Sequence, residues 1–477
     1  MKIAMISSES NPLCKSGGLA DVVYSLSEQL VHDGHEVIIV LPCYRGIANG
    51  TRKLKKVASF TVYMSWRRQA AMVYETTIEG IRFYLIANDY YFDRDKLYGY
   101  DDDGERFAFF ALASVRLLKK IGFKASIVHV HDWQTAMVPC LAKEKMRDDP
   151  FYDGMKFVLT IHNPAFKGMV DRYFLQDFYG LDDSLFDTGK VRFNGMVSTL
   201  KSGIVYSDRI TTVSPTHREE LLRSDSGQGL EGVLNLRRDD FLGILNGIDY
   251  EEWNPATDPF IAKNYDAKTL REGKSANQSA LLGSFHIKWY GGPVYGFVSR
   301  LSWQKGIDLL LPCAERALSK GASMAILGSG EYELEQRFES LRKRYPDTLG
   351  LYIGYNEPLA HKIYAGSDFF LMPSLFEPCG LSQMIAQRYG TLPIVRFTGG
   401  LSDTVEGYDE TKGGEGCDGI GFRNYDEGSL EYAMSLSRKV AKDKNLYYGM
   451  AKRAMGIDHS WRSSEKRYVK LYEDLLK

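Results

Sequence analysis

Short buried runs of β-branched and aliphatic residues alternate with segments of helical periodicity along most of the chain. Residues 2–7 predict the first strand and residues 36–41 (EVIIVL) the second. Between them, apolar residues recur at the three- and four-residue spacing of a helix: Leu19, Val22, Val23, Leu26 and Leu30. The chain therefore opens with a βαβ unit, which places two parallel strands in one sheet.

The alternation continues in two series. In the first, residues 60–87 predict a β-hairpin that turns at Glu79-Gly80, and further buried strands follow at 126–132, 156–163 and 209–214. The second series predicts buried strands at 293–300, 323–330, 349–355, 369–374 and 392–397. This pattern predicts an α/β fold with two Rossmann-like domains facing a central cleft, because ligands of open parallel sheets bind at the carboxyl ends of the strands.

The length of the chain also favours two domains, because 477 residues exceed what one hydrophobic core usually supports. Residues 246–285 show little periodicity and contain Pro255 and Pro259, so we expect a linker there. We assign residues 1–245 to an N-terminal domain and residues 246–456, linker included, to a C-terminal one.

Composition narrows the set of partners. A formal net charge of -1 offers no field for nucleic acid or an anionic membrane. No stretch approaches the roughly 18 apolar residues of a membrane span. The six cysteines are scattered without a zinc-type spacing, and the chain begins with a strand pattern rather than a presequence, so we expect a cytoplasmic protein with reduced thiols.

Gly17 and Gly18 follow the first strand and open the first helix, with Lys15 just before them. Glycines there let a ligand approach the backbone, and the N–H groups of a helix N-terminus attract phosphate. A merely tight turn is the alternative reading of this loop. The pattern GGLADVV at 17–23 returns as GGLSDTV at 399–405, which suggests two related halves but could also arise by chance.

The second series of strands carries its own charged positions. Arg300 ends a buried strand and Lys305 follows five residues later, so two cations could stabilise a leaving diphosphate. Glu377 lies between a buried strand and a helix start, where its carboxylate could hold sugar hydroxyls, while the amides of Leu381 and Ser382 could bind phosphate. Solvated surface charges and a helix-capping glutamate are the plainer alternatives.

Polar residues also end the strands of the first series. His162 and Asn163 lie where a sheet binds ligands, although a satisfied core histidine is equally compatible with the sequence. His129 and His131 alternate along one strand but have no third ligand at a useful spacing, so we expect no metal there. The acidic run 101–103 precedes a helical pattern and predicts helix capping rather than a metal-held nucleotide.

Taken together, these motifs resemble those of the bacterial glycogen synthase and plant starch synthase family. The resemblance covers nearly the whole chain and rests on these segments: KSGGLADV (15–22), VHVHDW (128–133), TIHNPAFKG (160–168), TTVSPTH (211–217), ILNGIDYEEWNPATD (244–258), SRLSWQKGIDLL (299–310), IGY (353–355) and PSLFEPCGLSQ (373–383). It implies a GT-B fold in which a C-terminal helix, within 457–477, crosses back to the first domain.

The resemblance also implies the reaction. ADP-glucose would donate glucose to the non-reducing 4-hydroxyl end of glycogen or another α-1,4-glucan, with retention of configuration and without a metal or cofactor. The same resemblance assigns catalytic positions to Glu377, His162, Arg300 and Lys305. It assigns substrate-binding positions to Lys15, Gly18, Asp21, Asp132, Asn246, Tyr355, Cys379, Gly380, Leu381 and Ser382.

Particular roles follow from the resemblance for some of these residues. Lys15 would join the two other cations on the diphosphate, Tyr355 would stack on adenine, and Asp132 would lie on the acceptor side. His162 and Asn246 would hold the region of the glucose 6-hydroxyl.

Two features separate this family from its neighbours and from other classes. Related GT-B enzymes carry a second Glu eight residues after the first, but Ile385 stands there in this chain, which argues against the sucrose-synthase-like branch. A dinucleotide-dependent dehydrogenase could share the α/β alternation, but the first strand is not followed by GxGxxG. A transferase for another nucleotide or acceptor and a non-catalytic glucan-binding protein are the remaining alternatives.

Overall fold

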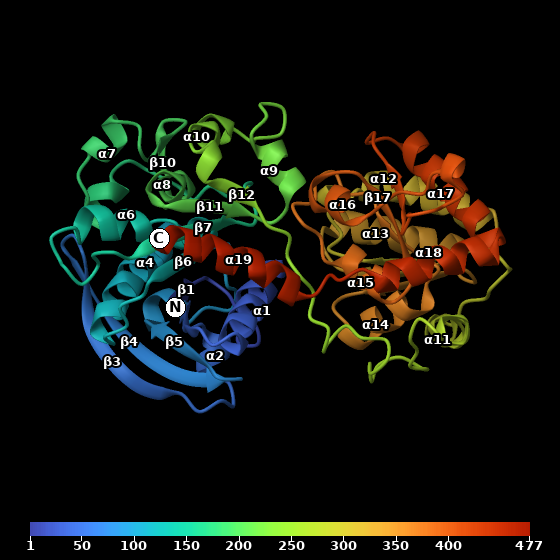
Figure 1. The fold of residues 1–477 in the computed structure, drawn as a ribbon, viewed down its shortest axis with the longest axis horizontal. Coiled ribbons are helices and arrows are strands. Elements are labelled where there is room, and N and C mark those ends of the chain that lie inside the picture. Colours follow the sequence, from blue (N-terminus) through green and yellow to red (C-terminus); the bar gives the residue numbers. More distant parts are fainter. The chain divides into compact units, whose positions relative to one another are not determined.

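The computed structural model describes residues 1–477, which form two compact units. The first unit contains Met1–Asn246 and Trp461–Lys477, and the second contains Gly247–Ser460 (Figure 1). A nine-stranded sheet forms the centre of the first unit and a six-stranded sheet the centre of the second. The predicted α/β fold with two Rossmann-like sheets is confirmed.

The large sheet of the first unit has the strand order β12-β11-β7-β6-β1-β2-β5-β4-β3. Its strands are β1 (Lys2–Ile6), β2 (Glu36–Pro42), β3 (Lys55–Met64), β4 (Arg67–Ile78), β5 (Ile81–Ala87), β6 (Ile127–His131), β7 (Lys156–Ile161), β11 (Arg209–Thr212) and β12 (Phe241–Gly243). A small separate sheet consists of β8 (Met169–Val170), β9 (Arg192–Phe193) and β10 (Met196–Ser198).

Helices of very different lengths connect these strands. The α-helices are α1 (Gly18–His32), α2 (Arg45–Ala48), α3 (Asp89–Phe92), α4 (Asp103–Lys120), α5 (Asp132–Thr135), α6 (Val138–Cys140), α7 (Ser184–Asp187), α8 (Thr199–Tyr206), α9 (Pro215–Leu221), α10 (Glu231–Leu236) and α19 (Trp461–Leu476). Two π-helical turns and one 3-10 turn complete the set: η1 (Leu141–Lys145), η2 (Leu175–Tyr179) and η3 (Arg238–Asp240).

The second unit has an all-parallel sheet with the order β15-β14-β13-β16-β17-β18. Its strands are β13 (Val294–Val298), β14 (Ser323–Gly328), β15 (Leu349–Ile353), β16 (Phe369–Met372), β17 (Leu392–Arg396) and β18 (Ile420–Phe422). Its helices are α11 (Leu270–Phe285), η4 (Trp303–Lys305), α12 (Ile307–Ser319), α13 (Tyr332–Arg344), α14 (Glu357–Gly366), α15 (Ser382–Arg388), α16 (Gly399–Thr404), η5 (Glu410–Lys412), α17 (Glu427–Lys442) and α18 (Lys444–Gly456).

Burial on both faces explains why the central strands read as continuous apolar runs. In β1, which pairs with β2 on one side and β6 on the other, the four residues Ile3–Ile6 are completely buried. The paired β13 and β14 are likewise almost fully buried in the second unit. The hydrophobic pattern of the sequence therefore located these strands.

The predicted hairpin is confirmed, but the structure contains a third antiparallel strand that the sequence pattern did not predict. β4 and β5 are antiparallel and joined by Glu79 and Gly80, whose φ angles of 44° and 81° suit a tight two-residue turn. β3 extends this arrangement as a third antiparallel strand at the edge of the sheet. Most β3 residues are at least partly exposed, so the strand left little hydrophobic signal in the sequence.

Two other expectations were wrong in part. The stretch expected as a linker, 246–285, is irregular only in its first part and ends in the 16-residue helix α11. The acidic run does stand at the start of α4, but the N-cap residue Asp102 makes no capping hydrogen bond. Asp102 instead pairs with Arg94, and Asp103 pairs with Arg106, which is buried and therefore needs a counter-charge.

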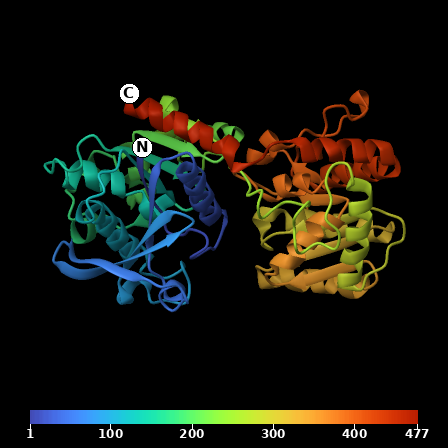
Figure 2. The same ribbon diagram turned by 60° about the horizontal axis from the view of Figure 1, so that its bottom comes forward.

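The C-terminal helix α19 belongs to the first unit, where it packs beside α1 (Figures 1 and 2). Its Tyr472 hydroxyl forms a hydrogen bond of 2.7 Å with Nδ1 of His129 in β6. The other ring nitrogen of His129 lies 2.6 Å from the hydroxyl oxygen of Thr160 in β7. The C-terminal residues are thus tied to the centre of the N-terminal sheet. No helix is long and apolar enough to span a membrane.

We predict that Tyr472→Phe lowers the free energy of unfolding of the first unit by about 1–3 kcal/mol, because one nitrogen of the buried His129 ring loses its partner. Urea denaturation followed by tyrosine and tryptophan fluorescence measures the change. Tyr63→Phe is the matched control, since the Tyr63 side chain is 46% exposed. Equal stability of the two variants would contradict the anchoring role of Tyr472.

Candidate active site

In the first unit, the candidate residues gather at the carboxyl ends of three neighbouring strands. β7, β6 and β1 are adjacent and parallel. Lys15 lies in the loop after β1 and Gly18 begins α1, β6 is followed directly by Asp132, and His162 follows β7. Parallel strands end at the same edge of a sheet, so residues far apart in the sequence become neighbours there.

Two carboxylates, those of Glu9 and Asp21, bind residues of the loop after β1. Buried Glu9 accepts hydrogen bonds from the backbone N–H and the hydroxyl of Ser16. Lys15 forms an ion pair of 2.7 Å with Asp21, in the first turn of α1. Burial raises the pKa of Glu9, although its hydrogen bonds with Ser16 counteract the shift.

The backbone of this loop bears on the choice between phosphate binding and a tight turn. Gly17 is extended, with φ near -160°, and a Cβ there would meet no atom within 4 Å. Neither backbone conformation nor internal packing therefore requires glycine at this position. The start of α1 is therefore open enough for a ligand to approach the backbone, and phosphate binding at this loop stays a prediction.

Asp132 fixes the end of β7 from the neighbouring strand. Its carboxylate accepts backbone hydrogen bonds from His162 at 2.7 Å and Asn163 at 3.3 Å. Asp132 adopts a left-handed conformation with φ of 55°, which aspartate tolerates better than most residues and which often occurs at functional sites. Burial raises the pKa of Asp132 to about 7, although the two backbone hydrogen bonds oppose this shift.

His162 is oriented by a second histidine. Nε2 of His162 lies 3.1 Å from Nδ1 of His131, so the two rings form a hydrogen-bonded pair. Burial lowers the pKa of His162 to about 3 and the pKa of His131 well below its usual range. His162 is therefore neutral at pH 7 and suits a hydrogen-bonding role, while both ring nitrogens of His129 already have protein partners and leave no atom for a metal.

Asn246 is the last residue of the first unit and follows β12. Its side chain is buried, and its amide oxygen has no hydrogen-bond partner. Buried polar atoms without a partner are uncommon, and a ligand hydroxyl is one group that can satisfy such an acceptor. This feature fits the sugar-binding role that the family resemblance implies for Asn246.

In the second unit, Lys305 and Glu377 form the central contact. The ammonium group of Lys305 lies 2.6 Å from Oε2 of Glu377, and the hydroxyl of Ser374 donates to the same oxygen at 3.0 Å. A small cavity of about 60 Å³ opens beside this ion pair. Its lining includes Lys305, Ser374, Glu377, Gly380, Leu381 and Ser382.

Gly399 and Gly400 pack closely against the backbone of the Glu377 loop. The backbone N–H of Gly400 donates to the carbonyl oxygen of Glu377 at 3.1 Å. A Cβ on Gly399 would lie 2.0 Å from that carbonyl oxygen, and a Cβ on Gly400 would lie 2.1 Å from the carbonyl oxygen of Cys379. The repeated GGL pattern thus marks a close backbone contact at the start of α16, in contrast to the open Gly17 position.

The structure brings some of the predicted residues together and leaves others apart. Lys305, Glu377, Gly380, Leu381 and Ser382 share one cavity, whereas Cys379 is buried and does not line it. Arg300 lies exposed just after β13 and Tyr355 is 81% exposed after β15, both outside that lining. The roles of Arg300 and Tyr355 stay predictions.

Three supporting residues were not identified from the sequence as parts of the site. No local sequence pattern distinguishes Glu9 or Ser374. Only the folded chain places Glu9 against Ser16 and Ser374 against Glu377. His131 had a signal, since it precedes Asp132 at the end of a buried strand. Its partner, His162, is 31 residues away in the sequence.

Two α/β units with mainly parallel strands, each with polar and charged groups where its parallel strands end, are the architecture of a GT-B glycosyltransferase. Family models agree with this class: residues 2–236 match the starch synthase catalytic domain, and residues 292–431 match glycosyl transferases group 1. The chain is 45% identical to the glycogen synthase of Geobacillus thermodenitrificans, over 100% of this chain and 98% of that protein. The glycogen synthase of Clostridium kluyveri is 42% identical over the full length of both chains.

The chain therefore belongs to the glycogen and starch synthase family and is a glycosyltransferase, which confirms the resemblance and excludes the dehydrogenase alternative. A solved structure agrees: the catalytic domain of starch synthase IV from Arabidopsis thaliana, bound to ADP and acarbose, is 34% identical with a TM-score of 0.92, and each chain covers 99% of the other. Sucrose-phosphate synthase from Thermosynechococcus elongatus, at 17% identity and a TM-score of 0.62, shares the fold.

We predict that Gly400→Ala lowers kcat/KM for glycosyl transfer on the order of 10²-fold, because the added methyl group displaces the Glu377–Cys379 backbone. Steady-state kinetics of the purified variant measures the loss, and far-UV circular dichroism checks the fold. Gly449→Ala in α18 is the control, since a Cβ there meets nothing within 4 Å. Wild-type kinetics in Gly400→Ala would contradict the proposed support of the loop.

A second prediction concerns Asp132 and pH. Because burial raises the folded-state pKa of Asp132 from 3.8 to about 7, the folded protein binds this proton more tightly than the unfolded chain does. The contribution of Asp132 to stability is fully present below about pH 4 and is lost as the pH rises to about 7.

Asp132→Asn removes this titration but keeps an oxygen that can accept the His162 hydrogen bond, and asparagine tolerates the left-handed conformation. We therefore expect the variant to gain stability relative to wild type between pH 4 and pH 7, as measured by urea denaturation at several pH values. A constant difference across this range would show that Asp132 does not titrate there.

Proposed function

We propose that this protein is a glycogen synthase that transfers glucose from ADP-glucose to the non-reducing 4-hydroxyl end of an α-1,4-glucan, with retention of configuration. The observation that carries the proposal is the partly buried ion pair between Lys305 and Glu377 beside a small cavity, in a chain that matches glycogen synthases over its full length. The related starch synthase IV was solved with ADP and acarbose, which supports an adenine nucleotide and an oligosaccharide ligand.

Each unit contributes a distinct set of groups to this proposal. We assign acceptor binding to the first unit, through Asp132, and nucleotide-sugar binding mainly to the second, through Lys305 and the amides of Leu381 and Ser382. Gly18 and Lys15 of the first unit would add an amide and a cation to the diphosphate. Lys15 is already paired with Asp21, so it would have to exchange this partner for phosphate oxygens.

The proposed reaction is a substitution on one face of the glucose ring. The bond between the anomeric carbon and the diphosphate oxygen breaks, while the acceptor 4-hydroxyl oxygen forms the new bond on the same face. The acceptor proton moves to the departing phosphate oxygen. Lys305 and Arg300 would stabilise the negative charge that develops on the diphosphate as the bond breaks.

Glu377 and His162 would act on the sugar rather than on the leaving group. A retaining glycosidase needs two carboxylates about 5 Å apart, one of which forms a covalent intermediate. Glu377 is already engaged by Lys305 and Ser374, which suits the positioning of sugar hydroxyls better than nucleophilic attack. His162 is neutral at pH 7 and would form a hydrogen bond near the 6-hydroxyl group of the donor glucose.

The six free cysteines, five of them buried, fit the cytoplasmic location that we propose for this reaction, since reduced thiols persist in a reducing compartment.

The proposal predicts that glycogen gains labelled glucose from ADP-glucose faster than from UDP- or GDP-glucose, and that Glu377→Gln lowers kcat by about 10²-fold or more. Radiolabel incorporation into polymer measures both effects. Glu333→Gln, which removes an exposed carboxylate at the start of α13, is the control for Glu377→Gln. A preference for another donor would reassign the nucleotide, and absence of labelled polymer with all donors would favour a non-catalytic glucan-binding protein.

A further inference from the structure

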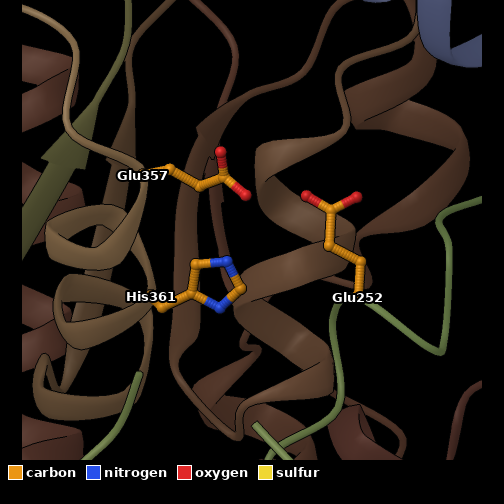
Figure 3. A group of neighbouring side chains, drawn as sticks. All are labelled: Glu252, Glu357 and His361. Carbon is orange, nitrogen blue, oxygen red and sulfur yellow. The ribbon is translucent and has the colours of Figure 1, made fainter. Parts of the chain in front are cut away.

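Three potential metal ligands converge in the second unit, outside the residues assigned to the reaction. Glu357 is the first residue of α14, and His361 lies one turn later on the same helix face. Glu252 comes from the turn near the start of the second unit. Figure 3 shows the two carboxylates and the imidazole directed toward a common space, and their ligand atoms all lie within 4.8 Å of one another.

The imidazole of His361 is buried and contacts the indole of Trp253 and the carboxylate of Asp258. Its side chain is 1% exposed, and the indole of Trp253 stacks on the ring with centroids 4.1 Å apart. Nδ1 of His361 lies 2.8 Å from Oδ2 of Asp258. Nε2 is also buried but has no hydrogen-bond partner, and in Figure 3 this nitrogen faces the carboxylates of Glu357 and Glu252.

The surroundings of Asp258 determine which nitrogen of His361 can bind a ligand. Asp258 accepts hydrogen bonds from the Tyr389 hydroxyl at 2.5 Å and from the backbone N–H of Phe260 at 2.8 Å. A carboxylate that serves as an acceptor requires a proton on Nδ1 of His361. In the neutral ring, Nε2 then presents its lone pair to the cluster, as in the carboxylate–histidine–metal arrangement of many zinc sites.

We propose that Glu252, Glu357 and Nε2 of His361 bind one Zn²⁺ ion. The two carboxylates would balance the charge of the cation, and imidazole with carboxylate oxygen is a ligand set that zinc accepts. Three protein ligands leave one coordination position for water, as in zinc sites that remain open. Zinc–ligand bonds of about 2.0–2.2 Å need a slightly tighter cluster, which exposed Glu252 can supply by a small side-chain movement.

A purely structural explanation accounts for only part of this geometry. The favourable position of an acidic residue at a helix N-terminus and the hydrogen bond from the Tyr355 hydroxyl at 3.1 Å would explain Glu357. Neither feature explains why a buried nitrogen without a partner faces two carboxylates. Without a cation, the two negative charges would also repel each other at this short separation.

Bound zinc would join the turn that carries Glu252 to the first turn of α14, both within the second unit. It would also bind the carboxylate that accepts the Tyr355 hydroxyl, and Tyr355 is the predicted adenine-stacking residue. The zinc proposal itself does not depend on the proposed function, because its test measures metal binding rather than glucosyl transfer.

The test uses the full-length protein after removal of metals with EDTA and dialysis. Isothermal titration with Zn²⁺ should show one tight equivalent, and Glu252→Gln and Glu357→Gln should each weaken it by at least about tenfold. Asp258→Asn should weaken binding by about 10–100-fold by releasing the His361 ring. Glu333→Gln removes an exposed carboxylate elsewhere in the same unit, and this variant should bind Zn²⁺ like wild type. The glutamate variants avoid altering the buried histidine, and circular dichroism checks their fold.

Two further measurements make the outcome decisive. Zn²⁺ should raise the Tm of wild type but not of the Glu252→Gln, Glu357→Gln double variant, because a ligand stabilises only the state that binds it. Co²⁺ in place of Zn²⁺ should give ligand-field bands without the intense sulfur-to-metal band of a cysteine site. Absence of a tight equivalent in wild type, full affinity in the double variant, or a sulfur-to-metal band would each overturn the proposal.

Discussion

The common end point of parallel strands is the constraint on which the candidate site in each unit depends. The central strands of such a sheet are buried on both faces, so polar side chains that are open to a ligand lie at or beyond the strand ends, and the carboxyl ends of parallel strands share one edge. In the first unit, this edge collects Asp132 and His162 beside the start of α1. In the second unit, it collects Lys305 from the segment after β13 and Glu377 from the segment after β16.

Buried polar groups in these sites are positioned mainly by other buried polar groups. Asp132 fixes the backbone at His162, His131 meets the ring of His162, and Ser374 and Lys305 hold Glu377. Such networks are favourable only when their members are satisfied, because an unpaired polar group in a dry environment is costly. Two of the buried atoms without a hydrogen-bond partner lie among the candidate ligand-binding residues. The amide oxygen of Asn246 suits a sugar hydroxyl as its partner, whereas Nε2 of His361 suits the proposed cation.

Glycine has different meanings in the two GGL segments. At Gly17 an added Cβ would meet no atom within 4 Å, so internal packing does not require glycine there. At 399–400 the added side chain would collide with the backbone of the Glu377 loop. The same sequence pattern therefore occurs in two different packing environments, which only the atoms around each glycine distinguish.

The sequence by itself determined the α/β alternation, nearly all of the parallel strands and the turn at Glu79-Gly80, because these features depend on local periodicity. It also determined the family, because the family motifs consist of consecutive residues. It did not reveal β3, whose edge position left its residues partly exposed, or the helix α11 within the expected linker. Only the tertiary structure showed that Asp102 and Asp103 form ion pairs with arginines rather than capping hydrogen bonds. It also showed that the rings of His131 and His162 are hydrogen-bonded and that Glu252 lies close to His361. These contacts join residues from separate parts of the fold, and their geometry follows from how whole strands and helices pack, which no local pattern encodes.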